Sequence, residues 1–125
     1  MRSPKISDAE WEVMTVLWDE FPRSSAAVVE ALAPTTGWNP KTVKTLLTRL
    51  VKKGFVVTES EGNRYLYLPA MSRREAVGEE SRSFLDRVFQ GDAASLLLHF
   101  ARSVDLSEEE AQKLRDLLDA SGGQA

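Results

Sequence analysis

Residues 39–53 form the most strongly charged stretch of this 125-residue chain. They contain five Lys or Arg side chains and no Asp or Glu, and three threonines are interleaved with them. Cations of this kind pair with phosphate oxygens, whereas threonine offers a hydroxyl and a methyl group that suit the edges of nucleic-acid bases. The stretch therefore has the residue types that bind a polyanion, although the formal net charge of the chain is −3.

The negative net charge comes from the C-terminal part of the chain. Residues 1–70 hold nine basic and eight acidic side chains, whereas residues 71–125 hold seven basic and eleven acidic ones. The basic stretch thus lies in a nearly neutral part, and the acidic part makes a poor contact for DNA. The position of the charges, rather than their sum, indicates a nucleic-acid-binding surface.

The side chains on which most enzymes depend are scarce. The chain has no cysteine and one histidine, His99, so we expect no thiolate metal site, no disulfide and no Ser/His/Asp triad. Adjacent carboxylates such as Glu79–Glu80 and residues 108–110 fit solvated helix faces and helix caps. We therefore predict no enzyme, no metal and no cofactor. Because no apolar run approaches the ~20 residues that cross a bilayer, we also predict a cytoplasmic protein without membrane insertion.

Apolar spacing and helix-capping signals predict three helices followed by a β-hairpin in residues 1–70. Ser7, Ser24 and Asn39 are of types that cap helix N-termini, and each precedes apolar side chains at helical spacing. After the third helix the pattern alternates as in strands, around a turn at Gly62–Asn63. We place helices at about residues 8–21, 26–33 and 40–53 and strands at residues 55–58 and 65–68. The predicted fold class is mainly α with a small β-hairpin wing, a winged helix-turn-helix.

The third predicted helix is the candidate DNA-contacting element, because in this fold it enters the major groove while the wing reaches the flanking backbone. Thr42, Thr45 and Arg49 are expected to contact base edges, since short hydroxyl side chains and a long guanidinium suit that role. The other polar side chains are better placed for phosphates, where they add affinity without sequence information. They are Asn39, Lys41, Lys44, Thr48, Lys52 and Lys53 on the helix and Arg64 on the wing.

Other interpretations of the same residues stay open at this point. The basic face could be only a solvated helix surface, or it could meet an acidic partner in a protein-interaction module. A regulator gated by a small apolar effector between two domains is a third alternative, although the sequence offers no convergent polar groups for it.

The residues beyond 70 are predicted to form a helical dimerisation region, residues 71–125. They contain more apolar side chains than three short helices bury by themselves, and two-fold pairing of the DNA-binding domains would match a palindromic operator. An alternative is that these side chains pack on their own winged domain. The residues predicted for dimerisation are Phe84, Leu85, Val88, Leu96, Leu97, Phe100, Leu114, Leu117 and Leu118.

Four segments resemble the penicillinase-repressor family of bacterial winged-helix regulators, the BlaI/MecI type. They are residues 6–18, the run Trp38-Asn39-Pro40-Lys41-Thr42-Val43 and its continuation to Gly54, residues 64–67, and residues 96–107. The resemblance implies a homodimeric repressor that binds promoter palindromes, with Lys41, Thr42, Thr45 and Arg49 in the recognition helix. It further implies control of β-lactam resistance genes.

The resemblance also implies a mode of induction. Antibiotic-responsive members are cleaved at an Asn–Phe bond in the dimerisation region through a membrane sensor protease, and the matching bond here is His99–Phe100. The Phe matches and the Asn does not, so cleavage at His99–Phe100 is a hypothesis. The copper-responsive branch of the family uses paired cysteines, and their absence excludes a copper–thiolate switch.

Overall fold

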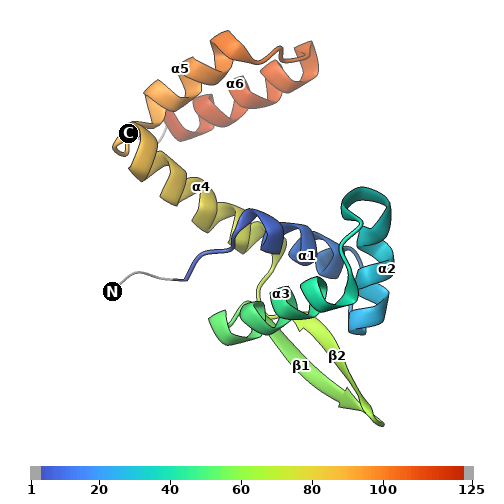
Figure 1. Cartoon of the computed structure of the whole chain (residues 1–125). Helices are drawn as coiled ribbons and strands as arrows, with labels where there is room; N and C mark the ends of the chain where they lie inside the picture. Colours follow the sequence, from blue (N-terminus) through green and yellow to red (C-terminus); the bar gives the residue numbers. More distant parts are fainter. Residues whose placement is uncertain (1–3, 123–125) are drawn as a thin grey trace. The chain divides into compact units, whose positions relative to one another are not determined.

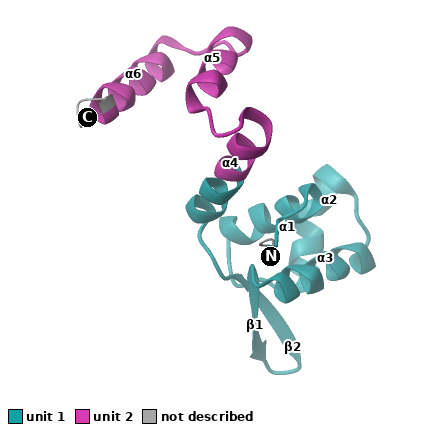
Figure 2. Cartoon of the chain, turned by 90° about the vertical axis from the view of Figure 1, so that its left-hand side faces the viewer, with its two compact units in different colours: residues 1–80 teal, residues 81–125 magenta. Residues whose placement is uncertain are grey.

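The computed structural model describes residues 4–122. They fall into two compact units, of which the N-terminal unit ends at Glu80 and the C-terminal unit begins at Ser81 (Figure 2). The elements along the chain are α1 (Asp8–Asp19), α2 (Ser25–Thr36), α3 (Pro40–Lys53), β1 (Val56–Glu61), β2 (Arg64–Pro69), α4 (Arg73–Phe89), α5 (Ala93–Ser103) and α6 (Glu108–Gly122) (Figure 1). This order confirms the predicted class, mainly helical with a hairpin wing.

Side-chain caps begin the three helices of the N-terminal unit, as the sequence predicts. Ser7 Oγ accepts the backbone N–H of Glu10 at 3.2 Å, and Glu10 Oε1 accepts the backbone N–H of Ser7 at 2.8 Å. Ser24 and Asn39 accept backbone N–H groups in the first turns of α2 and α3 at 3.2 and 2.9 Å. Because these bonds satisfy otherwise unpaired donors, they fix where each helix starts.

The second helix runs further than the sequence predicts. The sequence places its end near residue 33, whereas α2 continues through Pro34 to Thr36. The hydroxyl of Thr36 donates to the Leu32 carbonyl at 3.0 Å, and Gly37 then closes the helix in a left-handed conformation with φ of 64°. The last turn is therefore held by side-chain and cap bonds that propensity alone does not reveal.

The apolar core of the N-terminal unit lies between α1, α2, α3 and the base of the hairpin. Burying a side chain of this size contributes about 1.5–3 kcal/mol, so the core holds the apolar face of α3 firmly inward. The opposite face of the same helix is consequently left in solvent. The buried cluster consists of Val13, Met14, Leu17, Val28, Leu32, Val43, Leu46, Leu47, Leu50, Phe55, Val56 and Tyr67.

The wing is an antiparallel hairpin in which β1 and β2 pair from Val56 opposite Pro69 to Glu61 opposite Arg64. Gly62 occupies the first turn position with φ of 63°, which is the conformation that a type II′ hairpin turn requires of glycine. The backbone of Arg23, in the loop after α1, exchanges hydrogen bonds with Tyr67 at 3.1 and 2.8 Å. The base of the wing is thus attached to the helical core.

The division between the units falls within α4, ten residues beyond the predicted boundary. Ala76, in the first turns of α4, is 3% exposed, and the indole Nε1 of Trp18 donates to the Met71 carbonyl at 3.0 Å. The start of α4 therefore packs as part of the N-terminal unit. The functional division after residue 70 stays a prediction.

The C-terminal unit contains the end of α4 together with α5 and α6. None of residues 81–121 is buried. Of the nine side chains predicted for dimerisation, Leu85, Leu96 and Leu114 are half-buried and the other six are exposed. The exposed six include Leu117, which is 68% exposed. Within residues 4–122, no helix is long and apolar enough to span a membrane.

Candidate nucleic-acid interface

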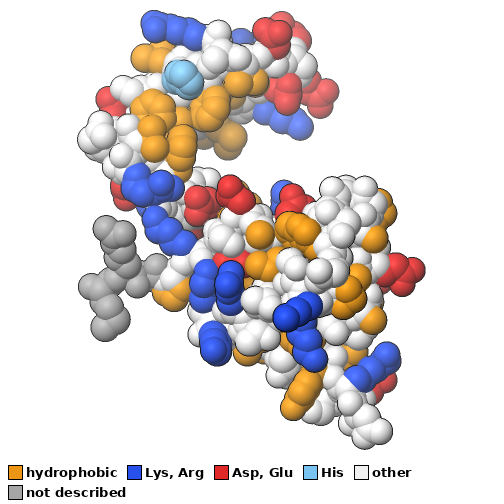
Figure 3. Space-filling view, in the orientation of Figure 1, with side chains coloured by type: hydrophobic (Ala, Val, Ile, Leu, Met, Phe, Trp, Pro, Cys, Tyr) orange, Lys and Arg blue, Asp and Glu red, His pale blue; other side chains and the backbone are white. Residues whose placement is uncertain are grey.

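The exposed face of α3 carries the basic and threonine side chains that the sequence predicts for DNA binding. Its buried residues are Val43, Leu46, Leu47 and Leu50, and none of its residues is acidic. Figure 3 shows Lys and Arg side chains gathered over α3. The exposed predicted residues on or beside α3 are Asn39, Lys41, Thr42, Lys44, Thr45, Thr48, Arg49 and Lys52.

The start of α3 is fixed by Asn39 and Pro40. Asn39 Oδ1 accepts the backbone N–H of Thr42 at 2.9 Å, so the group that it can still offer to a ligand is its amide NH2. Pro40 stands at the first helical position, where its missing N–H costs nothing. A donor at the N-terminus of a helix is well placed for an anion such as a phosphate.

Two threonines on the exposed face of α3 form hydrogen bonds within the helix. The hydroxyl of Thr45 donates to the Lys41 carbonyl at 3.0 Å, and that of Thr48 donates to the Lys44 carbonyl at 2.9 Å. Such bonds between a side chain and the carbonyl four residues earlier are common for helical threonine. They fix the direction in which each hydroxyl proton points.

Lys53, which the sequence groups with the phosphate-contacting residues, has partners inside the protein. Its Nζ lies 2.7 Å from Oε1 of Glu10 and 2.8 Å from the backbone oxygen of Lys5. Glu10 is 1% exposed, whereas the Lys53 side chain is 32% exposed. The last residue of α3 is thus engaged with the first turn of α1 rather than free for DNA.

The environment of Glu10 keeps its carboxyl group ionised. Burial by itself raises the pKa of Glu10, but hydrogen bonds from Lys53 and Ser7 outweigh that effect, and the net pKa lies below the ordinary value of 4.5. Glu10 Oε2 is buried and has no hydrogen-bond partner. The sequence does not indicate the pairing of Glu10 with Lys53, because the two residues are 43 positions apart along the chain.

Arg64 is on the wing, as the sequence predicts, but it has an acidic neighbour. Its guanidinium lies 3.8 Å from Oε1 of Glu61, and both side chains are largely exposed. Glu59 is also exposed on β1. The outer part of the wing therefore carries more negative than positive charge, in contrast to α3.

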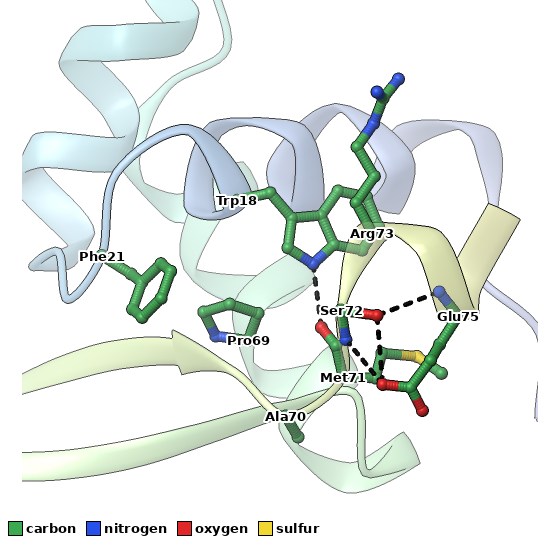
Figure 4. A pocket seen from close by; sticks show the side chains of 8 residues that line it. All are labelled: Trp18, Phe21, Pro69, Ala70, Met71, Ser72, Arg73 and Glu75. Carbon is green, nitrogen blue, oxygen red and sulfur yellow. Dashed lines mark hydrogen bonds between the residues drawn. The ribbon is translucent and has the colours of Figure 1, made fainter.

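A pocket of about 440 Å³ lies beside the connection from β2 to α4 (Figure 4). Trp18, Phe21 and Pro69 form much of its apolar lining. Its polar lining is occupied: Ser72 and Glu75 cap α4 through mutual hydrogen bonds of 3.0 to 3.2 Å. In Figure 4 the Arg73 side chain extends away from Pro69 and Phe21. The lining therefore lacks the convergent free polar groups that orient a small-molecule ligand.

Comparison with known proteins gives relatives over nearly the whole chain. The chain is 38% identical over 116 residues to the penicillinase repressor of Bacillus licheniformis, covering 93% of this chain and 91% of that protein. It is 35% identical over 114 residues to the methicillin resistance regulatory protein MecI of Staphylococcus aureus, covering 91% and 93%.

Solved structures of the repressor BlaI match more than half of the chain. The solution structure of the DNA-binding domain of the repressor BlaI is 40% identical with a TM-score of 0.52, covering 58% of this chain and 88% of that one. Monomeric Bacillus licheniformis BlaI in complex with the blaP half-operator is 39% identical with a TM-score of 0.51, covering 59% and 90%. Residues 6–120 match the family model described as penicillinase repressor. With this match and the two relatives, the chain belongs to the penicillinase repressor family.

Proposed function

We propose that the protein is a transcriptional repressor that binds operator DNA through α3, and that it is not an enzyme. The observation that carries the proposal is the exposed face of α3, which holds basic and threonine side chains and no acid on a helix anchored by four buried apolar residues. A rigid helix with such a face fits the major groove. The BlaI structure in complex with a half-operator supports the same use of the fold in this family.

The side chains of α3 divide into two roles in this proposal. Thr42, Thr45 and Arg49 contact base edges, because they lie on the exposed face and offer groups that distinguish base pairs. Phosphates are contacted by Lys41, Lys44, Lys52 and the Asn39 amide, which supply affinity that falls with salt. Arg64 reaches the flanking backbone from the wing.

The repressor acts as a homodimer on a palindromic operator. The C-terminal unit supports this proposal, because it leaves apolar side chains such as Phe84, Val88 and Leu117 exposed and buries none of residues 81–121. Exposed apolar surface of this kind marks protein interaction sites. A second copy of the same chain would cover it and present two recognition helices to two half-sites.

The names of the relatives support a proposal for the genes that the protein controls. Because two relatives are a penicillinase repressor and a methicillin-resistance regulator, we propose that this protein controls β-lactam resistance genes. We also propose that it acts in the cytoplasm. We propose relief by a membrane sensor protease that cleaves His99–Phe100. Both residues are exposed on α5, and the ring of His99 lies 6.3 Å from that of Phe89, the last residue of α4. Because the bond is within a helix, α5 must open locally before a protease can cut it.

Binding to DNA tests the main proposal. Genome-wide mapping of bound sites, followed by titration of one bound palindrome and a shuffled duplex at two salt concentrations, should give sequence preference and a steep salt dependence. Arg49→Ala should weaken operator binding by about 1–3 kcal/mol and relax sequence preference, whereas Lys52→Ala should weaken both duplexes alike and reduce the salt slope by about 1. Equal affinity for both duplexes would favour the protein-interaction alternative.

The cleavage hypothesis has a separate test. Cells producing the protein and grown with and without a β-lactam are examined by immunoblot with an antibody to the N-terminal unit. The hypothesis expects a fragment ending at residue 99 only under induction, and Phe100→Ala should abolish it. An intact chain during derepression would contradict cleavage while leaving the DNA-binding proposal untouched.

A further inference from the structure

The hydroxyl groups of Thr45 and Thr48 each have their one proton committed within α3. Thr45 Oγ1 donates to the Lys41 carbonyl and Thr48 Oγ1 to the Lys44 carbonyl, at 3.0 and 2.9 Å. Both side chains are exposed. A threonine hydroxyl has one donor and two acceptor lone pairs, so that only the oxygen lone pairs and the methyl group stay available to a ligand.

A ligand that needs the hydroxyl proton must take it from the helix carbonyl. That exchange removes one hydrogen bond for each one made, and the net gain in affinity is correspondingly small. A ligand that donates to the oxygen, or that packs on the methyl group, leaves the bond to the carbonyl in place. The helix therefore favours donor and apolar groups opposite these two threonines.

Base edges differ in whether they present hydrogen-bond donors, acceptors or apolar groups. In the major groove guanine presents only the acceptors N7 and O6, whereas cytosine presents the N4 amino donor, adenine the N6 amino donor, and thymine a C5 methyl group. Phosphate oxygens are acceptors only. The committed protons thus disfavour guanine and phosphate and favour thymine, adenine or cytosine.

We infer that Thr45 selects a base through its methyl group or its acceptor oxygen and discriminates against guanine, and that Thr48 does not donate to a phosphate. This inference rests on the proposed binding of α3 to DNA and specifies the polarity of the contact. It removes Thr48 from the phosphate-contacting residues predicted from the sequence. That role stays with Lys41, Lys44, Lys52 and Asn39 on or beside α3 and with Arg64 on the wing.

Three variants separate the contributions of the threonine side chain. Thr45→Val keeps the shape and the methyl group but removes the oxygen, whereas Thr45→Ser keeps the hydroxyl and removes the methyl. Thr48→Val tests the phosphate contact. Thr15→Val is the matched control, because Thr15 is also exposed and donates to the carbonyl four residues earlier, that of Trp11 at 2.8 Å, but lies on α1.

The probe is the duplex sequence that the wild-type protein selects from a random pool. Single bases are replaced by analogues that lack the thymine methyl, the adenine or cytosine amino group, or the purine N7 acceptor. At one base, loss of the methyl or amino group should weaken wild-type binding by about two- to tenfold, the worth of a single contact. If the Thr45 methyl group packs on the base, Thr45→Ser should bind the modified and unmodified duplexes alike. If the Thr45 oxygen accepts from an amino group, Thr45→Val should do so. Thr48→Val should bind as tightly as Thr15→Val at every salt concentration.

Two results would overturn the inference while DNA recognition by α3 stands. The first is that removing a purine N7 weakens binding of the wild-type protein but not of Thr45→Val. That result would mean that the Thr45 hydroxyl donates to N7. The other is a base-independent loss in Thr48→Val with a reduced salt slope, since it would mean that Thr48 contacts phosphate. Failure to select any sequence would instead refute the proposed function, and the inference with it.

Discussion

Lys53 Nζ lies 2.7 Å from Glu10 Oε1, and this contact joins the last residue of α3 to the first turn of α1. Glu10 also accepts the Ser7 backbone N–H, so that one buried carboxylate caps α1 and holds the end of α3. The helix α3 is therefore fixed at its N-terminus by the Asn39 cap and at its C-terminus by the Lys53–Glu10 ion pair. Helices held at both ends present their exposed side chains in a defined register.

Lys53→Met should lower the free energy of unfolding by about 2–3 kcal/mol, because it leaves the buried Glu10 carboxylate without its cation. It should leave the salt slope of DNA binding unchanged. Lys52→Ala is the matched control, since Lys52 is exposed and expected at a phosphate. Urea unfolding and salt titrations measure both quantities. A reduced slope in Lys53→Met would show that Lys53 contacts DNA.

The Lys53–Glu10 ion pair should make the free energy of unfolding depend on pH. The pKa of Glu10 is lowered by folding, so its contribution to stability is fully present above its unfolded value of about 4.5 and is lost as pH falls through the lower folded pKa. Urea unfolding of the wild type and of Glu10→Gln should therefore differ most at neutral pH and converge in acid. A difference that persists or grows in acid would contradict the assignment.

Glu61→Gln should strengthen DNA binding. The substitution releases Arg64 from its 3.8 Å pairing and removes one negative charge from the wing. We expect a gain of about 0.5 kcal/mol that shrinks as salt is added, since exposed charges are screened. Glu12→Gln on α1 is the control of equal charge. Fluorescence anisotropy with operator DNA measures the affinity of both variants. An equal gain in the control would assign the effect to net charge, and no gain would place the wing away from DNA.

Leu117→Glu should shift the protein toward monomer in sedimentation. Leu117 is 68% exposed on α6, and a carboxylate in an apolar interface is costly to desolvate. Affinity for a palindrome should fall much more than affinity for a half-site, because the loss is one of bivalency. Gln112→Glu adds the same charge at a polar position of α6 and should remain dimeric. An unchanged dimer in Leu117→Glu would place the interface elsewhere.

The elements that the sequence predicts well are those with local causes. The caps at Ser7, Ser24 and Asn39 act over three residues, and the period of apolar side chains on α3 sets its buried face without reference to the rest of the chain. The exposed basic face follows directly from that period, and the family resemblance covers the same residues.

The features that the sequence does not reveal depend on distant or conformational partners. The pairing of Lys53 with Glu10 spans 43 residues and arises only when α1 and α3 pack together. The proton directions of Thr45 and Thr48 depend on side-chain rotamers, and the sequence records only that hydroxyls are present. The helix α2 continues through Pro34, and the hydroxyl of Thr36 donates to the Leu32 carbonyl in the last turn.

On the proposed dimer model, the absence of any buried residue among residues 81–121 would make repression depend on the concentration of the protein. On the proposed dimer model, the C-terminal unit gains its apolar burial from a second copy, so its stability rises with the concentration of the chain itself. At low copy number the unpaired chain would lose operator affinity, and its C-terminal helices would at the same time be exposed to proteases. Operator occupancy would then fall more steeply than the amount of repressor, giving the promoter a threshold.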